Sequence, residues 1–391
     1  MSCINFEKNM KILIFSHGIP SDIDPQWGCF ELDQAKALEA LGHKVTLAAI
    51  DGRFRKSRAG RGVVYSEFGK IHAYLYYLIP YRLLGLQTLR IKVRSWMTRR
   101  LFGVICKKEG FPDIIYAHYL FTMGGLDLVH RDYPDIPVVG IEHWSHLSKK
   151  ELSPADVTRG LVGYGLADRL LAVSPSLQLQ IKNHFGKDSE VVYDTVDNVF
   201  LESSIKEEKP VIPFRFISVG TLNEGKGYDV LIRAFAAMAN HASELIIIGD
   251  GPEKEGILQL CKDLQVEDRI VLKGRLSHEE IVKNLAEANA YVLASRSETF
   301  GVSYIEAMAM GLPAIATRCG GPESFMNDSC GLMVDVDDVA GLTVAMDRMV
   351  EHIRDYSPEA IREYVRSRFS GKVIARQLEQ IFEEVIHKKK Q

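Results

Sequence analysis

Short apolar runs alternate with longer amphipathic stretches along the whole chain. The runs of the first half are "KILIFSHG", "HKVTLAAI", "DIIYAHY", "PVVGIEH", "RLLAVS" and "SEVVYDTVD". The pattern restarts in the second half with "FRFISVG", "ELIIIGDG", "RIVLKGR", "AYVLAS" and "PAIATR". Buried parallel strands that alternate with helices have this pattern. The sequence therefore predicts an α/β protein with two Rossmann-like, doubly wound domains.

The spacing between the runs predicts helices and a domain boundary. Helices are expected over about 31–41, over "YDVLIRAFAAMAN" and over about 375–386. The charged, proline-bearing segment "KEEKPVIP" at 206–213 has weak periodicity and is the predicted linker. The predicted domains are 1–205 and 206–370. A C-terminal helix over about 371–391 is expected to pack back on the first domain.

Composition narrows the class of protein. The chain has 391 residues, of which 46% are hydrophobic and 25% charged, as in soluble globular proteins. A net charge of -3 gives no electrostatic argument for a nucleic-acid partner. The six cysteines are scattered without CxxC spacing, which favours reduced thiols, and no apolar segment approaches a membrane span or a signal-peptide core. These features predict a cytoplasmic protein.

Glycine-rich loops follow several of the predicted strands, where doubly wound domains bind their ligands. In "GTLNEGKGYDVL", Lys226 leads into a helix, so an ammonium and free helix N–H groups form a candidate anion site. A glycine-rich turn with a solvated lysine is the alternative, and no Walker A motif is present. "GDGPE" adds a second glycine exit at Gly249, and "GGPE" at 320–323 a third.

The segment "SETFGVSYIEAMAMGLP" at 297–313 places two carboxylates around a predicted helix start. Gly301 would let a ligand approach the backbone, and the N–H groups near Val302 and Ser303 would be free donors. Glu298 precedes those donors and Glu306 lies about one turn into the helix. A ligand with a sugar, a diphosphate and a ribose in a row fits this arrangement. The alternatives are a buried structural or capping role for Glu306 and a surface loop charge for Glu298.

Taken in order, these motifs resemble glycosyltransferase family 4, whose members are retaining enzymes of the GT-B fold with two domains facing a central cleft. The glutamate pair matches the E-x7-E motif of that family. The resemblance implies that Glu298 contacts the transferred sugar and Glu306 the ribose. It also implies that Lys226 holds the diphosphate with N–H groups from Phe300 to Ser303, and that no metal or other cofactor is required.

One position departs from the family pattern. The family commonly has an arginine where this chain has Thr221, and that arginine is the second cation on the phosphates. A bidentate cation is lost there. Arg275 and Arg296 are candidate replacements, and a more loosely held diphosphate is the alternative.

The first half matches the family more loosely. Gly28 falls where a family glycine approaches the donor phosphates. "GIEHWSHL" aligns His143 with a family histidine that reaches the donor sugar, and "YAHYLFTMGG" places His118 on the acceptor side. Either histidine could equally be a packed or solvent-facing residue. Asp194 replaces a usual asparagine, and a structural role near the hinge is expected.

A basic segment at 82–108 contains eight Lys and Arg residues and no acidic one, with apolar residues at helical spacing. Such a segment is typical of a helix that lies on an anionic membrane surface. A helix with one core face and one solvated face is the alternative.

The family resemblance therefore implies hexosyl transfer from a UDP-, GDP- or ADP-sugar to a saccharide or lipid-linked acceptor hydroxyl, with Glu298, His143 and Lys226 as catalytic residues. The setting would be cell-surface polysaccharide or glycolipid synthesis, in the cytoplasm or on the inner face of the plasma membrane. A GT-B-like epimerase or phosphorylase and a non-catalytic sugar-nucleotide binding protein are the alternatives.

Overall fold

The computed structural model describes residues 9–21, 24, 27–53, 62–77, 87–205 and 212–391. The chain divides into two compact units, residues 1–195 with 371–391, and residues 196–370. The sequence placed the first boundary at 205/206, ten positions later. Residues 206–211 of the predicted linker, and residues 82–86 of the basic segment, lie outside the described part.

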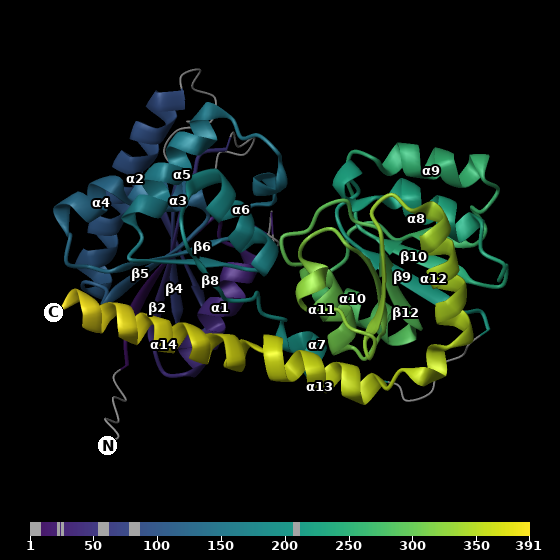
Figure 1. The fold of residues 1–391 in the computed structure, drawn as a ribbon. Helices are drawn as coiled ribbons and strands as arrows, with labels where there is room; N and C mark the ends of the chain where they lie inside the picture. The colour runs from purple at the N-terminus through teal and green to yellow at the C-terminus, as the bar shows by residue number, and fades with distance from the viewer. Residues whose placement is uncertain (1–8, 22–23, 25–26, 54–61, 78–86, 206–211) are drawn as a thin grey trace. The chain divides into compact units, whose positions relative to one another are not determined.

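Unit 1 is built on an eight-stranded sheet of order β3-β4-β2-β1-β5-β6-β7-β8 (Figure 1). Its strands are β1 Lys11–Ser16, β2 Lys44–Asp51, β3 Gly62–Phe68, β4 Ile71–Tyr77, β5 Ile114–His118, β6 Val138–Glu142, β7 Arg169–Ala172 and β8 Glu190–Val191. Its helices are α1 Cys29–Ala40, α2 Gln87–Glu109, α3 Leu120–Met123, η2 Gly124–Leu126, α4 Asp127–Asp132, η3 Ser145–Ser148, α5 Pro154–Leu166, α6 Pro175–Phe185 and α14 Gly371–Lys389. All pairs are parallel except β3–β4, so the doubly wound sheet ends in one antiparallel edge strand.

Unit 2 has a six-stranded, all-parallel sheet of order β11-β10-β9-β12-β13-β14. Its strands are β9 Arg215–Val219, β10 Glu244–Ile248, β11 Ile270–Leu272, β12 Ala290–Leu293, β13 Ala314–Thr317 and β14 Gly331–Val334. Its helices are α7 Asn198–Glu202, η4 Glu224–Lys226, α8 Tyr228–Ala236, α9 Lys254–Asp263, α10 His278–Glu287, α11 Val302–Ala309, η5 Pro322–Ser324, α12 Val339–Glu351, η6 Ile353–Asp355 and α13 Pro358–Phe369. The strand order reverses between β9 and β12, and ligands of such sheets bind at that point, beyond the carboxyl ends of the strands.

Apolar strands and helix faces form the cores, as the sequence pattern predicts. Strands β1, β5, β6, β12 and β13 are buried along almost their whole length, because helices cover both faces of each sheet. Helix α14 follows unit 2 in the chain but packs on α1 of unit 1. Phe382 of α14 contacts Tyr116, with ring centroids 5.2 Å apart, and both side chains are buried.

The two places where the chain crosses between the units lie next to each other. Val196 forms a parallel bridge with Ser370, and its N–H donates to the Phe369 carbonyl at 2.9 Å. Unit 1 is composed of two segments of the chain, 1–195 and 371–391, while unit 2 is the continuous segment 196–370. This bridge lies where the chain enters and leaves unit 2.

Candidate active site

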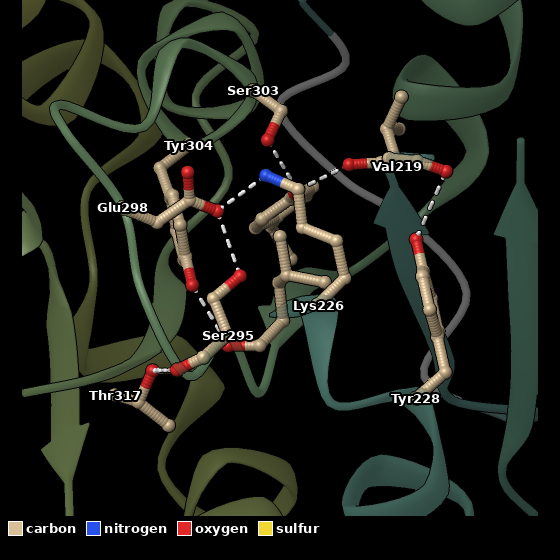
Figure 2. Close-up of polar contacts among 11 residues, drawn as sticks. Val219, Lys226, Tyr228, Ser295, Glu298, Ser303, Tyr304 and Thr317 are labelled. Carbon is tan, nitrogen blue, oxygen red and sulfur yellow. Dashed lines mark hydrogen bonds and ion pairs between the residues drawn. The ribbon is translucent and has the colours of Figure 1, made fainter. Parts of the chain in front are cut away.

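The loops after β9 and β12 bring a lysine and a glutamate together at the switch point of unit 2. The Lys226 ammonium donates to Glu298 Oε1 at 2.6 Å, and the Ser295 hydroxyl donates to the same oxygen at 2.7 Å. Figure 2 shows both donors directed at that carboxylate. The side chains of Lys226 and Glu298 are 23% and 10% exposed, so solvent screens this pair only in part. The ammonium has three N–H donors and directs one of them at Glu298, so the other two can bind an anion.

The tip of α11 lies beside this pair. Gly301 precedes the helix with a φ of 107°, a conformation that glycine adopts without strain, and the first helical N–H groups have no acceptor within the helix. The Tyr291 hydroxyl lies 2.8 Å from Ser303 Oγ and 3.0 Å from the Val219 carbonyl, so β9, β12 and α11 are joined at their ends. Glu306 is 8% exposed, on a helix that is otherwise apolar at its centre.

A second loop closes on the same region. The Gly321 N–H donates to the Glu298 carbonyl at 2.9 Å, and the Gly320 N–H donates to the Glu323 carboxylate at 2.8 and 3.0 Å. A Cβ atom at Gly321 would lie 2.3 Å from the Phe300 carbonyl oxygen, so only glycine fits. The backbone of Glu298 and Phe300 is thus held by the loop after β13.

The remaining predicted donor residues of unit 2 lie at the ends of β9, β10 and β11. Thr221 is exposed, and Gly249 passes so near the β9 exit that a Cβ atom would lie 1.9 Å from the Gly220 oxygen. Arg275 is exposed in the loop after β11. Arg296, the other candidate replacement for the missing arginine, donates to Asp229 at 2.8 Å, to Asp337 at 2.7 Å and to the Glu224 carbonyl of η4 at 2.7 Å, so its guanidinium holds these three segments together.

Two histidines meet at the carboxyl edge of the sheet of unit 1. His118 Nδ1 lies 3.1 Å from His143 Nε2, and His143 Nδ1 lies 3.1 Å from Asp194 Oδ1. Burial opposes protonation of His143, but the charges of Asp194, Glu31 and Glu142 outweigh it and raise the pKa of His143. Burial and the charge of His143 lower the pKa of His118 well below its usual value. His143 therefore binds a proton more readily than an isolated histidine does, and His118 less readily.

Buried carboxylates surround this histidine pair. Glu142 accepts hydrogen bonds from the Tyr164 hydroxyl at 2.7 Å and from the backbone N–H groups of Leu120, His143 and Trp144 at 2.8 to 2.9 Å. Glu31, on the first turn of α1, accepts from the His17 N–H at 3.0 Å. Burial raises the pKa of both carboxyl groups. Gly28 lies directly before α1, with a φ of 88°.

Comparison with known proteins accounts for residues 32–368 of the chain. Residues 32–199 match the family described as Glycosyltransferase Family 4, and residues 200–368 match Glycosyl transferases group 1. The chain belongs to glycosyltransferase family 4. It is 26% identical over 380 residues to N-acetyl-alpha-D-glucosaminyl L-malate synthase of Bacillus anthracis. The aligned region covers 92% of this chain and 94% of that protein. It is 30% identical over 213 residues to the lipopolysaccharide core biosynthesis glycosyltransferase LpsE of Rhizobium meliloti, 54% of this chain and 59% of that one.

Solved structures confirm the predicted GT-B fold. The crystal structure of Anabaena Alr3699/HepE in complex with UDP and glucose superposes with a TM-score of 0.72 at 17% identity, over 96% of this chain and 100% of that chain. At that identity the likeness concerns the fold.

In this glycosyltransferase the predicted residues form two groups, one in each unit. Unit 2 brings Lys226, Glu298, Gly301, Ser303 and Glu306 to one edge of its sheet, and their roles toward a donor stay predictions. His118 was predicted on the acceptor side, but its side chain is 0% exposed behind His143, so it cannot contact an acceptor as placed. Both ring nitrogens of His143 already have partners, His118 and Asp194. A hydrogen bond to a donor sugar would require the ring to give up one of these partners.

Three residues that contact the predicted ones, in one unit or the other, had a weak signal in the sequence or none. Asp194 was expected to be structural, yet it is the acidic partner of His143. Its replacement of the usual asparagine was the only available sign of a charge there. Ser295 and Glu142 went unnoticed, because neither the turn that directs Ser295 to Glu298 nor the burial of Glu142 can be inferred from local spacing.

Among the residues that the structure describes, no group of three or more His, Cys, Asp and Glu side chains could hold a metal ion. No helix within the described ranges combines the length and apolar composition needed to cross a bilayer.

Proposed function

We propose that this glycosyltransferase moves a hexosyl group from a nucleotide diphosphate-sugar to an acceptor hydroxyl with retention of the anomeric configuration. One observation carries the proposal: Lys226, Glu298 and the N-terminus of α11 converge at the switch point of the unit 2 sheet. Such a site binds a diphosphate through the ammonium and the helix N–H groups. Relatives that act in lipopolysaccharide synthesis support a role in a cell-surface polysaccharide or glycolipid.

Charge develops in two places during this transfer. The sugar ring becomes positive and the departing diphosphate becomes more negative, so preorganised donors at the diphosphate lower the barrier. Lys226 and the N–H groups from Phe300 to Ser303 would supply that stabilisation. The carboxylate of Glu298 would bind sugar hydroxyls through its second oxygen, because Lys226 and Ser295 occupy the first.

We infer front-face attack by the acceptor, with the leaving phosphate taking the acceptor proton. The carboxylate of Glu298 is held by an ammonium and a hydroxyl, an arrangement suited to hydrogen bonding rather than to nucleophilic attack. A metal ion is not needed in this scheme, since Lys226 carries the compensating charge. Full activity in the presence of EDTA is expected, and a loss that Mg²⁺ restores would contradict this part of the proposal.

Kinetics of single variants test the site. Glu306→Ala should mainly raise the KM for the donor, through loss of the ribose contact. Glu298→Ala should mainly lower kcat, and Lys226→Ala should change both, each by about ten-fold to a thousand-fold. Glu351→Ala, at an exposed position of α12, is the matched control. Near-normal kinetics in all three site variants would refute the assignment.

The reaction class and the donor are tested on the unmodified protein. Thermal-shift screening against UDP-, GDP- and ADP-sugars identifies the donor, because stabilisation grows with concentration over affinity. Acceptor-dependent release of nucleoside diphosphate separates a transferase from an epimerase and from a phosphorylase, and NMR coupling at the new anomeric centre reports retention or inversion. Donor binding without turnover over a broad acceptor screen would favour a binding protein.

We also propose that α2 docks on an anionic membrane surface at the cytoplasmic face. Its exposed side carries Lys92, Arg99, Arg100, Lys107 and Lys108, while Met97, Leu101, Phe102 and Ile105 on the other side are buried in unit 1. Trp96 is 43% exposed among these cations, as interfacial tryptophans are. Co-sedimentation with anionic vesicles and not with neutral ones is expected, and equal binding to both would contradict it.

A further inference from the structure

A cavity of about 350 Å³ opens in unit 1, apart from the residues to which the proposed reaction assigns a role. Its lining includes Arg90 and Arg94 of α2, Arg159 of α5, and the rings of Phe121 and Trp144. Its volume lies in the range of sites for small organic ligands. The feature to be explained is the presence of three guanidinium groups in a largely apolar cavity.

The three arginines come from two helices. Arg90 and Arg94 are four positions apart on α2, which places them on one side of the helix. Arg94 is only 9% exposed, and its guanidinium donates to the Thr122 hydroxyl at 3.0 Å and lies 5.4 Å from the Phe121 ring centre. Arg159 donates to Asp156 at 3.2 Å, a carboxylate outside the lining. The described residues that line the cavity include no Asp or Glu, so its field is positive.

The rest of the lining is apolar. Ile91, Phe121, Trp144 and Val162 supply it, and the rings of Phe121 and Trp144 lie edge to face at 6.2 Å. A free inorganic anion would leave these side chains in contact with water. The lining is better matched by a ligand that joins an anion to an apolar group.

Gly125, at the start of η2, lies against the Arg94 side chain. A Cβ atom there would lie 3.3 Å from Arg94 Nε, which is a tight contact. The cavity also adjoins the histidine pair, since Trp144 follows His143 and both N–H groups bond to Glu142 at 2.9 Å. A ligand here would therefore place a group near the carboxyl edge of the sheet.

We propose that this cavity binds a phosphate or diphosphate ester attached to an apolar chain, as the anchoring part of the acceptor. The acceptor role rests on the proposed function. A single guanidinium saturates the two oxygens of a carboxylate, whereas three guanidinium groups match the larger number of oxygens and the higher charge of phosphate esters. The apolar side chains then contact the first segment of the attached chain.

Calorimetric titration of the whole protein with three probes tests the chemistry: geranyl diphosphate, geraniol and inorganic pyrophosphate. Geranyl diphosphate should bind at least about ten-fold more tightly than either fragment probe, because only it uses both parts of the lining. Equal affinity for geraniol and geranyl diphosphate, or for pyrophosphate and geranyl diphosphate, would overturn the proposal.

Variants locate the binding. Arg90→Gln and Arg159→Gln should each weaken geranyl diphosphate by about ten-fold to a hundred-fold, as expected for the loss of a charged hydrogen-bond donor. Arg131→Gln, which removes the same charge from the exposed surface of α4, is the matched control. An equal effect of all three substitutions would show non-specific attraction and overturn the site.

Vesicles distinguish the two sources of such a ligand. Binding to neutral vesicles that carry a long-chain polyprenyl phosphate, displaced by geranyl diphosphate, would show a lipid-linked acceptor. Binding of geranyl diphosphate without such vesicle binding would show a soluble one, and either result supports the shared chemistry. Donor binding, measured by thermal shift in the same variants, should not change. If the donor binds and turns over while geranyl diphosphate does not bind, this inference fails and the proposed function stands.

Discussion

The interaction free energy of the Lys226–Glu298 pair can be measured by replacing one residue, then the other, then both. Lys226→Met keeps the aliphatic length but removes the ammonium, and leaves the Glu298 carboxylate with the Ser295 hydroxyl as its one remaining side-chain donor among the described residues. Glu298→Gln leaves the Lys226 ammonium without its counter-charge. The double variant removes both charges, so no group is left unpaired.

The burial of the two side chains sets the expected size of the destabilisation. Exposed ion pairs contribute about 0–1 kcal/mol, while loss of one partner from a fully buried pair costs about 3–5 kcal/mol. With side chains 23% and 10% exposed, this pair lies between those cases. We expect each single variant to destabilise unit 2 by about 1–2 kcal/mol and the double variant to cost clearly less than their sum. The coupling free energy should be about 1 kcal/mol.

Hydrogen exchange of unit 2 is the suitable assay, because global unfolding of a two-unit chain need not be a single transition. Exchange rates of the β9 and β12 amides report the local opening free energy in all four proteins. The coupling should fall as salt rises, since part of the pair is exposed. Additive effects within about 0.5 kcal/mol, or a coupling that salt leaves unchanged, would refute the view that these two residues act as one unit.

Three further predictions concern other parts of the chain. The raised pKa of His143 makes its charge stabilising below its unfolded pKa of about 6.5, and that contribution is lost as pH rises through the folded pKa. Asp194→Asn should therefore lower thermal stability more at about pH 6 than at about pH 9, and an equal loss at both would contradict a stabilising interaction between Asp194 and a protonated His143. Gly321→Ala should destabilise unit 2 by about 1–3 kcal/mol and weaken donor binding, because its Cβ would lie 2.3 Å from the Phe300 oxygen; unchanged hydrogen exchange in the loop after β12 would count against it. Phe382→Ala should destabilise unit 1 by about 3–5 kcal/mol, measured by exchange of the β5 amides, whereas an effect confined to α14 would mean that the helix is not part of that core.

Most of the parallel strands of both units could be predicted, because each of these combines a short apolar run with a polar exit. Strands β3 and β4 escaped prediction for opposite reasons. The β3 segment is largely exposed at the sheet edge, and its apolar residues are only the short run Val63 to Tyr65. The apolar residues of β4 continue into a segment whose periodicity does not separate strand from helix. The short strand β14 has two half-buried residues and no clear pattern either.

The site was predictable as a set of motifs and not as a set of contacts. The E-x7-E pair and the glycine loops are local features, so their positions after strands could be inferred. Lys226 and Glu298 are 72 positions apart, and only the adjacency of β9 and β12 brings them into contact. The same holds for His118, His143 and Asp194, which come from three separate strand ends.

The return of α14 to unit 1 has a consequence for the order in which this polypeptide matures on the ribosome. The middle segment, 196–370, can acquire its structure while translation continues, because it needs no later residue. The earlier segment must wait with the surface around Tyr116 uncovered until residues 371–389 emerge, so it is during this interval that chaperones would be expected to bind the nascent chain.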